Sequence, residues 1–164
     1  YDAVELGRRL ANQWQGTFLT LNTPALLPDA DMCSRLLKLE QICNVLTRLA
    51  QADLALVGIG TLDNSVFLER RTLTIHDVQP LRVVGAVGEI LGRFYNAEGV
   101  ECDTPLKDRV VSLPLSVLKN IPNVVGVVTG GDRGLAVRAA IRGGLLKSLV
   151  IDEAAASAVL GRNL

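Results

Sequence analysis

The sequence comprises 164 residues, of which 49% are hydrophobic but only 4% are aromatic. This length suits one domain, and its core must be mainly aliphatic. Basic and acidic residues number 17 each, so the formal net charge is zero. Because duplex binding relies on clustered basic charge, this balance argues against a DNA-binding module within these residues.

Cysteine and histidine are too few and too scattered for a typical metal or redox site. Cys33, Cys43 and Cys102 form no metal-binding or redox spacing, and His76 is the single histidine. We therefore expect no metal and no cofactor. The sequence shows neither a membrane-spanning apolar run nor a signal peptide. We expect a cytoplasmic setting without membrane contact, with the thiols reduced and buried.

The first third of the chain is expected to form helices and two strands. A period of 3.6 residues in the apolar positions predicts helices, whereas β-rich or continuously apolar runs predict strands. In chain order the predicted elements are a helix over 2–14 capped by Asp2, a strand over 17–21, a helix over 29–37, a helix over 40–52 and a strand over 53–60. The last run is apolar throughout, which is typical of a strand buried on both faces. Trp14 and Phe18 are expected in the core.

The rest of the chain alternates strands and helices more regularly. Thr74 and Asp77 form a capping-box pattern at the start of a helix. The further predicted elements are a strand over 86–95, a turn over 96–99, a strand over 109–113, a helix over 114–119, a strand over 124–128, a helix ended by Gly143, a strand over 148–151 and a helix from Asp152 to 160. This alternation predicts an α/β fold with an open, mostly parallel sheet and helices on both faces.

Glycines mark a candidate binding loop at the end of the strand over 53–60. Ligands of open parallel sheets bind at the carboxyl ends of the strands. Gly58, Ile59 and Gly60 lie at such an end, where glycine lets backbone amides approach an anion closely. The alternative is a tight turn that only requires small residues, and the pattern alone leaves both open.

A second candidate loop contains Gly130, Gly131 and Arg133, at the start of a predicted helix. A cation at a helix N-terminus opposes the helix dipole by about 0.3–1 kcal/mol. A bound phosphate would remove that conflict and could accept two hydrogen bonds from the guanidinium. The alternatives are a solvated arginine or one paired with Asp132. At a third strand end, Asp152 is expected as a helix N-cap, with a ligand hydroxyl as a secondary possibility.

Glu89 is a carboxylate within a run of glycines and aliphatic residues. Burying it without a partner would be costly. It could accept hydrogen bonds from sugar hydroxyls, or it could form an ion pair with Arg93, Arg70 or Arg71. The sequence does not choose between these two roles.

Several ordered blocks of the chain resemble those of SorC-family regulators, which are sugar-responsive and DeoR-like bacterial transcription factors. These blocks cover residues 52–62, 85–95, 103–110, 139–145 and 149–156. The resemblance implies a fold similar to glucosamine-6-phosphate deaminase and ribose-5-phosphate isomerase, without catalysis. It also implies a sugar or phosphorylated sugar as effector, a homo-oligomer, and operator DNA bound through a separate helix-turn-helix.

The resemblance also assigns site residues. Glu89 matches an acidic effector contact, Arg133 matches a phosphate contact where relatives usually have lysine, and the loop 58–60 borders the pocket. Arg70 or Arg71 matches a second phosphate contact. Relatives begin this domain before Tyr1 with a strand and a phosphate loop, so residues 1–164 are expected to form a single but partial effector-binding domain without the helix-turn-helix.

Two other functions remain open on the same fold. The first is a sugar-phosphate isomerase or deaminase, which would need a positioned acid and base. The sequence offers no histidine near a glycine loop and no close pair of carboxylates at a strand end. The second is a module that only oligomerises. We therefore predict an effector-binding domain rather than an enzyme.

Overall fold

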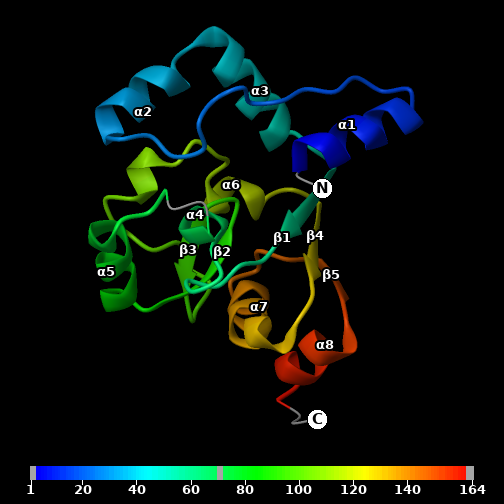
Figure 1. Ribbon diagram of the computed structural model, residues 1–164. Coiled ribbons are helices and arrows are strands. Elements are labelled where there is room, and N and C mark those ends of the chain that lie inside the picture. The colour runs from blue at the N-terminus through cyan, green and yellow to red at the C-terminus, as the bar shows by residue number, and fades with distance from the viewer. Residues whose placement is uncertain (1–2, 70–71, 162–164) are drawn as a thin grey trace.

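The computed structural model describes residues 3–69 and 72–161 (Figure 1). Three parallel strands form its main sheet in the order β1 (Leu54–Gly58), β4 (Asn123–Val128) and β5 (Ser148–Ile151). Helices pack beside this sheet, which confirms the predicted α/β class. Because the strands are parallel, their carboxyl ends lie at one edge of the sheet.

Residues 86–95 form a hairpin rather than the single strand predicted. Strand β2 (Ala86–Ile90) pairs antiparallel with β3 (Arg93–Asn96). The turn between them has positive φ angles at Leu91 (56°) and Gly92 (76°), as a two-residue hairpin of type I′ requires. Such turns usually have Asn, Asp or Gly before the glycine. Here leucine takes that position, so Gly92 alone is a turn signal in the sequence.

Eight α-helices are present in the described residues. They are α1 (Ala3–Gln13), α2 (Ala30–Leu37), α3 (Glu40–Ala50), α4 (Val66–Glu69), α5 (Ile75–Val83), α6 (Leu115–Leu118), α7 (Gly134–Arg142) and α8 (Glu153–Val159). Two short 3-10 turns, η1 (Lys107–Arg109) and η2 (Gly131–Arg133), complete the elements. The sequence predicted every one of these helices except α4, which is a single turn.

The helix starts confirm the caps predicted at Asp152 and at Thr74 with Asp77, and they add Asp29 as a cap that was not predicted. Asp29 accepts a hydrogen bond from an amide of the first turn of α2, and Asp152 does the same for α8. Thr74 and Asp77 form the predicted capping box of α5. The predicted cap at Asp2 lies outside the described residues.

Two predicted strands are not formed. Residues 17–21 form no regular element, and residues 109–113 contribute only an isolated bridge between Val110 and Leu26. A strand needs a neighbour for its hydrogen bonds. Within the described part of the chain, residues 17–21 pair with no strand, and residues 109–113 meet residues 25–27 at a single bridge. High β-propensity alone therefore did not produce a strand.

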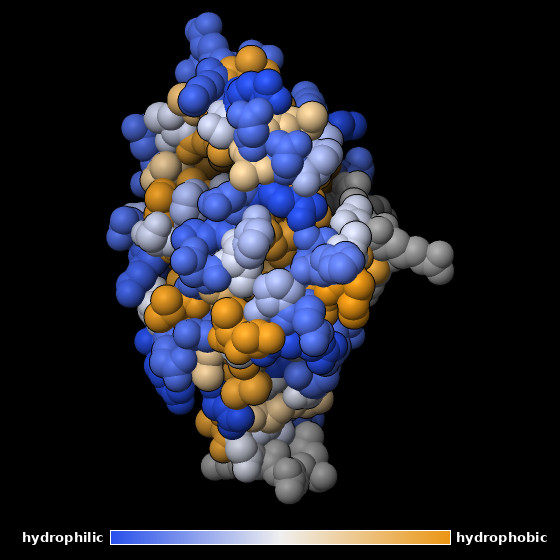
Figure 2. Space-filling view, turned by 90° about the vertical axis from the view of Figure 1, so that its left-hand side faces the viewer, coloured by the Kyte–Doolittle hydropathy of each residue, from blue (hydrophilic) through white to orange (hydrophobic). Residues whose placement is uncertain are grey.

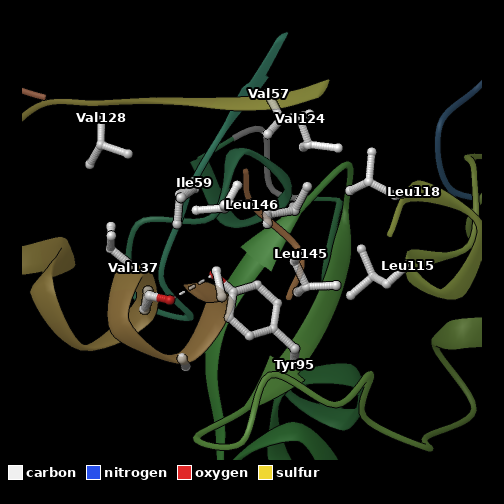
Figure 3. Close-up of a cluster of buried hydrophobic side chains, with 14 of the residues drawn as sticks. Val57, Ile59, Tyr95, Leu115, Leu118, Val124, Val128, Val137, Leu145 and Leu146 are labelled. Carbon is white, nitrogen blue, oxygen red and sulfur yellow. Dashed lines mark hydrogen bonds between the residues drawn. The ribbon is translucent and has the colours of Figure 1, made fainter. Parts of the chain in front are cut away.

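The main core lies between the inner face of the sheet and helices α6 and α7 (Figure 3). It is aliphatic, as the composition predicted, apart from one tyrosine. The Tyr95 hydroxyl donates a hydrogen bond to the Ala136 carbonyl over 3.1 Å. The labelled core residues in Figure 3 are Val57, Ile59, Tyr95, Leu115, Leu118, Val124, Val128, Val137, Leu145 and Leu146.

The outer face of the sheet is apolar but exposed. Leu54 and Leu56 of β1 are 50% and 54% exposed, and Val127 and Val150 on the neighbouring strands are similarly open. The prediction that the 53–60 strand is buried on both faces is therefore wrong for this structure. Trp14 is also exposed, contrary to prediction, while Phe18 is half-buried.

A second core cluster packs α5 against the β2–β3 hairpin, with Leu81 and Phe94 at its centre. Figure 2 shows hydrophilic side chains over the upper part of the molecule, formed by α2 and α3, and more hydrophobic ones lower down. Cys33 and Cys102 are buried and Cys43 is exposed, so the thiol prediction is correct for two of three. Among the described residues, no helix is both long enough and apolar enough to cross a bilayer.

Candidate functional site

The candidate site lies where the carboxyl ends of β1, β4 and β5 meet, at the edge of the sheet next to the hairpin (Figure 1). β1 leads into the loop 59–65, β4 leads into Thr129 and Gly130, and β5 leads into Asp152. The sequence predicted all three loops as candidates. The structure brings them to one edge because the strands are parallel and adjacent.

Gly60 and Glu89 are direct neighbours. The Gly60 amide donates to the Glu89 carbonyl over 2.9 Å, and the Glu89 amide donates to the Gly60 carbonyl over 3.0 Å. A side chain at position 60 would lie 3.6 Å from the Glu89 carboxylate. This pairing fixes the carboxylate beside the first glycine loop.

The Glu89 carboxylate is buried and partly unpartnered. The residue is only 7% exposed, and its Oε2 atom has no hydrogen-bond partner. Burial raises the pKa of this carboxyl, and a hydrogen bond with the Ser65 side chain lowers the pKa by a smaller amount. Ser65 is fully buried and was not identified from the sequence. Such a carboxylate still has capacity to accept a hydrogen bond from a ligand.

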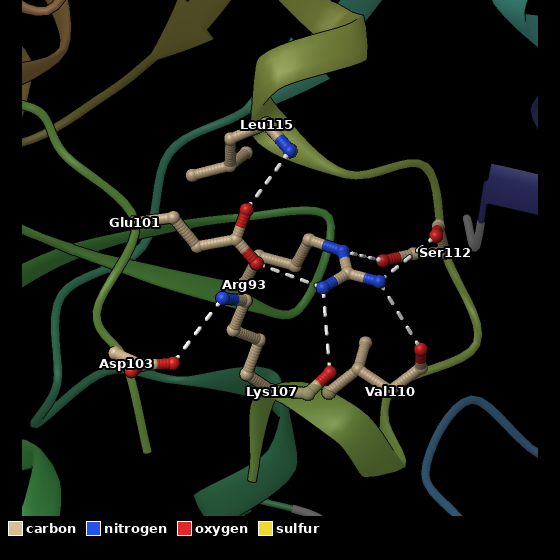
Figure 4. Close-up of polar contacts among 7 residues, drawn as sticks. All are labelled: Arg93, Glu101, Asp103, Lys107, Val110, Ser112 and Leu115. Atoms are coloured by element: carbon tan, nitrogen blue, oxygen red, sulfur yellow. Dashed lines mark hydrogen bonds and ion pairs between the residues drawn. The ribbon is translucent and has the colours of Figure 1, made fainter. Parts of the chain in front are cut away.

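The alternative ion pair between Glu89 and Arg93 is not formed. Arg93 instead pairs with Glu101 over 2.8 Å and donates to the Ser112 hydroxyl (Figure 4). The other two proposed partners, residues 70 and 71, lie outside the described residues. The same holds for the predicted phosphate contact at Arg70.

Arg133 is half-buried at the end of η2, directly before α7. Its guanidinium donates to the Thr129 carbonyl, and its Nε atom is buried without a partner. The predicted alternative of a pair with Asp132 is not formed, because that carboxylate accepts from the Asn64 amide. Arg133 therefore retains a donor for a ligand at the second glycine loop.

Gly130 links the second strand end to the third. Its φ angle of +89° is one that residues with a side chain rarely adopt. Its amide donates to the Asp152 carboxylate over 3.0 Å, while Asp152 also caps α8. The hydrogen bonds from the amides of Ala155 and Gly130 lower the pKa of the Asp152 carboxyl, and the one from Ala155 has the larger effect. The carboxylate is thus engaged in structure, as the N-cap prediction stated.

Three of the predicted residues contribute only backbone here. The Ile59 side chain is buried in the main core (Figure 3). Gly58 is the last residue of β1, and a side chain built there would meet no atom within 4 Å. Gly131 begins η2 and packs against α8. The predicted loops therefore lie at the site, but the side chains that could contact a ligand belong to other residues.

A cavity of about 530 Å³ opens beside these loops. Thr61 and Asn64 of the first loop, Asp132 of η2 and Arg82 of α5 provide its polar lining. The remaining lining residues are Leu62, Asp63, Ala86, Val87, Leu135 and Ala136. None of these was predicted, because exposed Asn and Asp in loops carry no distinctive sequence signal. Their place between the predicted loops is a result of tertiary packing.

A larger cavity, of about 1070 Å³, lies between α2, η1 and the start of α6. Arg93 and Glu101 line it, and they bind each other over 2.8 Å, while Glu101 also accepts from the Leu115 amide over 3.1 Å (Figure 4). The unpartnered buried side-chain atoms of the described residues belong to Glu89 and Arg133, near the smaller cavity. These unpartnered hydrogen-bonding atoms therefore favour the smaller cavity as the ligand site.

Comparison with known proteins gives a consistent result. Residues 1–161 match the family model for the sugar-binding domain, Sugar-bind. The transcriptional regulator LsrR of Escherichia coli O139:H28 is 35% identical over 141 residues, which cover 84% of this chain and 44% of that protein. The chain thus spans less than half the length of this relative.

Solved structures of relatives share the fold. The sugar-binding domain of a transcriptional repressor from Vibrio fischeri superposes with a TM-score of 0.88 at 31% identity, over 98% of this chain and 64% of that one. A SorC family regulator from Enterococcus faecalis gives a TM-score of 0.75 at 29% identity, over 97% of this chain and 62% of that one. The chain therefore belongs to the sugar-binding domain family of bacterial transcriptional regulators, and the SorC-type resemblance of its sequence is confirmed.

Proposed function

We propose that this domain binds a sugar or a phosphorylated sugar, as the effector of a bacterial transcription regulator of carbohydrate metabolism. The observation that carries the proposal is the pair of unpartnered buried atoms, Oε2 of Glu89 and Nε of Arg133. They are not part of the lining of the 530 Å³ cavity but adjoin it, because Glu89 pairs with Gly60 directly before Thr61, and Arg133 follows Asp132. That volume lies within the usual range for small-molecule sites.

The two groups suit different parts of such a ligand. Glu89 would accept a hydrogen bond from a sugar hydroxyl, and Arg133 would donate to a phosphate or a ring oxygen. The backbone amides of Gly60 and Gly130 are already engaged, by the Glu89 carbonyl and the Asp152 carboxylate, so the proposed ligand contacts are side-chain groups. Arg70 stays a prediction for a second phosphate contact.

Binding without catalysis is the favoured form of the proposal. An isomerase or deaminase needs two positioned proton-transfer groups. Glu89 is one such group, but its neighbour Ser65 and the engaged Asp152 do not provide a second. The named relatives are regulators. Turnover of a sugar phosphate by the purified chain would reverse this choice.

The role of the whole protein follows as part of the same proposal. The relatives extend well beyond the aligned part, with 44% of LsrR covered. We place operator binding in a helix-turn-helix outside residues 1–164, within a cytoplasmic homo-oligomer. Effector binding by the present domain would then change the affinity of the regulator for DNA.

A thermal-shift experiment tests the proposed function. The panel is ribose 5-phosphate, fructose 6-phosphate, glucose 6-phosphate and their unphosphorylated forms. At least one compound should raise the melting temperature of the wild type, and Glu89→Gln and Arg133→Ala should lose that response. Asp108→Ala, at an exposed residue in the larger cavity, should keep it. A wild type that responds to no compound would refute sugar binding by this chain.

A further inference from the structure

We infer that Asn64 and Asp132 form the hydroxyl-binding end of the 530 Å³ cavity, where they accept hydrogen bonds from two hydroxyl groups of the sugar. This inference rests on the proposed function and assigns a role to two residues beyond Glu89 and Arg133. Both side chains line the cavity and both residues are exposed. They come from loops 68 positions apart in the sequence.

The first argument is the hydrogen-bonding capacity that remains. The Asn64 side-chain amide donates to Oδ2 of Asp132. Oδ1 of Asn64 and Oδ1 of Asp132 accept no hydrogen bond from the described residues. One amide oxygen and one carboxylate oxygen are therefore open at the cavity. Both are pure acceptors, which match the hydroxyl donors of a sugar rather than the oxygens of its phosphate.

The second argument is that both side chains are held in place before a ligand arrives. The Asn64 backbone amide donates to the Thr61 hydroxyl over 3.1 Å, which fixes the loop after β1. The Asp132 carboxylate lies over Gly130, 2.9 Å from where a side-chain carbon would stand. Any larger residue at 130 would displace that carboxylate. Because the acceptors are fixed in advance, little conformational entropy is lost on binding.

The third argument is the distribution of charge in the cavity. Arg82 is the cation that lines the cavity, and it is already paired with Asp63 over 3.0 Å. Arg133 directly follows Asp132 in the chain, and its unpartnered Nε is the donor proposed for an anionic group. The acceptor pair and this donor are thus separate groups within one site. A phosphorylated sugar needs both: acceptors for its hydroxyl groups and a cation for its phosphate.

A metal ion fits these two residues less well than a hydroxylated ligand does. Calcium takes six to eight oxygen ligands, usually with several carboxylates. Within residues 3–69 and 72–161, no group of three or more Asp, Glu, His or Cys side chains could hold an ion. One carboxylate and one amide suffice for two hydroxyl groups.

Calorimetry on the whole chain tests this inference. Dissociation constants are measured for each compound of the thermal-shift panel, and for 2-deoxyribose 5-phosphate and 2-deoxyglucose 6-phosphate. Asp132→Ala should weaken binding by about 10- to 100-fold, because it removes a hydrogen bond to a charged group. Asn64→Ala should weaken it by about 3- to 10-fold. Asp108→Ala, the matched exposed control, should leave the constants unchanged.

The double variant separates ligand contact from a link between loops. If the pair only held the loops together, Asn64→Ala/Asp132→Ala would lose no more affinity than either single variant. Direct contact by both predicts a larger loss in the double variant, and a smaller penalty for a deoxy sugar than in the wild type. Equal affinities of wild type and variants would overturn the inference alone. Absence of binding to every compound would refute the proposed function as well.

Discussion

Glu89 is the residue whose chemistry depends most on its surroundings. The residue is 7% exposed, and burial raises the pKa of its carboxyl while a hydrogen bond with Ser65 offsets only part of the effect. A group with a raised pKa in the folded state favours folding at low pH. That stability is complete below the unfolded pKa, about 4.3 for glutamate, and it is lost as pH rises through the folded pKa.

Glu89→Gln should therefore flatten the pH dependence of stability. The glutamine cannot ionise, so the variant should gain stability relative to the wild type as pH rises from about 4. Urea unfolding of both proteins between pH 4 and 8 measures the difference. If the difference in free energy of unfolding between wild type and variant stays constant over this pH range, the burial of the Glu89 carboxyl does not raise its pKa.

Gly88 is a residue whose lack of a side chain is required by packing. A Cβ atom at this position would stand 2.3 Å from the Tyr95 ring, which is fully buried. Gly88→Ala should reduce the free energy of unfolding by about 1–3 kcal/mol through overpacking. Gly58→Ala is the matched control, since no atom lies within 4 Å of that site, and it should change stability by less than about 0.5 kcal/mol. Equal effects in chemical denaturation would disprove this packing argument.

At the scale of elements, a buried ion pair joins the hairpin to the loops that follow it. Arg93 of β3 and Glu101 have side chains only 8% and 15% exposed, and they reach the backbone of Val110, Ser112 and Leu115 (Figure 4). The pair thus holds β3, the chain before α6 and the start of α6 in one arrangement. This arrangement keeps the hairpin, and with it Glu89, in position.

Removal of one partner of this pair should be strongly destabilising. Glu101→Ala leaves a buried guanidinium without its carboxylate, and we expect a loss of about 3–5 kcal/mol. Asp103→Ala breaks the exposed pair with Lys107 and should cost less than about 1 kcal/mol. Thermal and urea unfolding give both values. Similar losses in the two variants would show that burial does not govern the effect.

At the scale of the whole molecule, the sheet is covered on one face and open on the other. The outer face is apolar, with Leu54, Leu56, Val127 and Val150 on it, and β4 is the one strand of the described residues that pairs with β1. An exposed apolar strand with an unpaired edge is a template for association. The same sheet still gathers the three strand ends into a site, because its inner face alone carries the main core.

This outer face should govern self-association of the 164-residue chain. Leu56→Lys places a charge beside the unpaired edge of β1 and should reduce association measured by sedimentation velocity. Ile75→Lys is the matched control, since Ile75 of α5 is 70% exposed but lies on a helix. If Ile75→Lys reduces association as much as Leu56→Lys, the strand edge is not the cause.

The sequence by itself determined the α/β class, most helices with their caps, and the three glycine-marked or acid-marked strand ends. Periodicity and capping are local properties, so they can be read from neighbouring residues. Glu89 and Arg133 stood out from their surroundings in the sequence, the family resemblance assigned them ligand contacts, and the structure shows both with unpartnered buried atoms. Their roles as ligand contacts stay predictions.

Only the tertiary structure decided which segments found partners. Residues 17–21 have the composition of a strand but no neighbouring strand, and residues 86–95 turn back at Leu91 to form a hairpin. Likewise, Asn64 and Asp132 meet across 68 positions because β1 and β4 are adjacent. Pairing and burial depend on residues distant in the chain, and no local pattern encodes them.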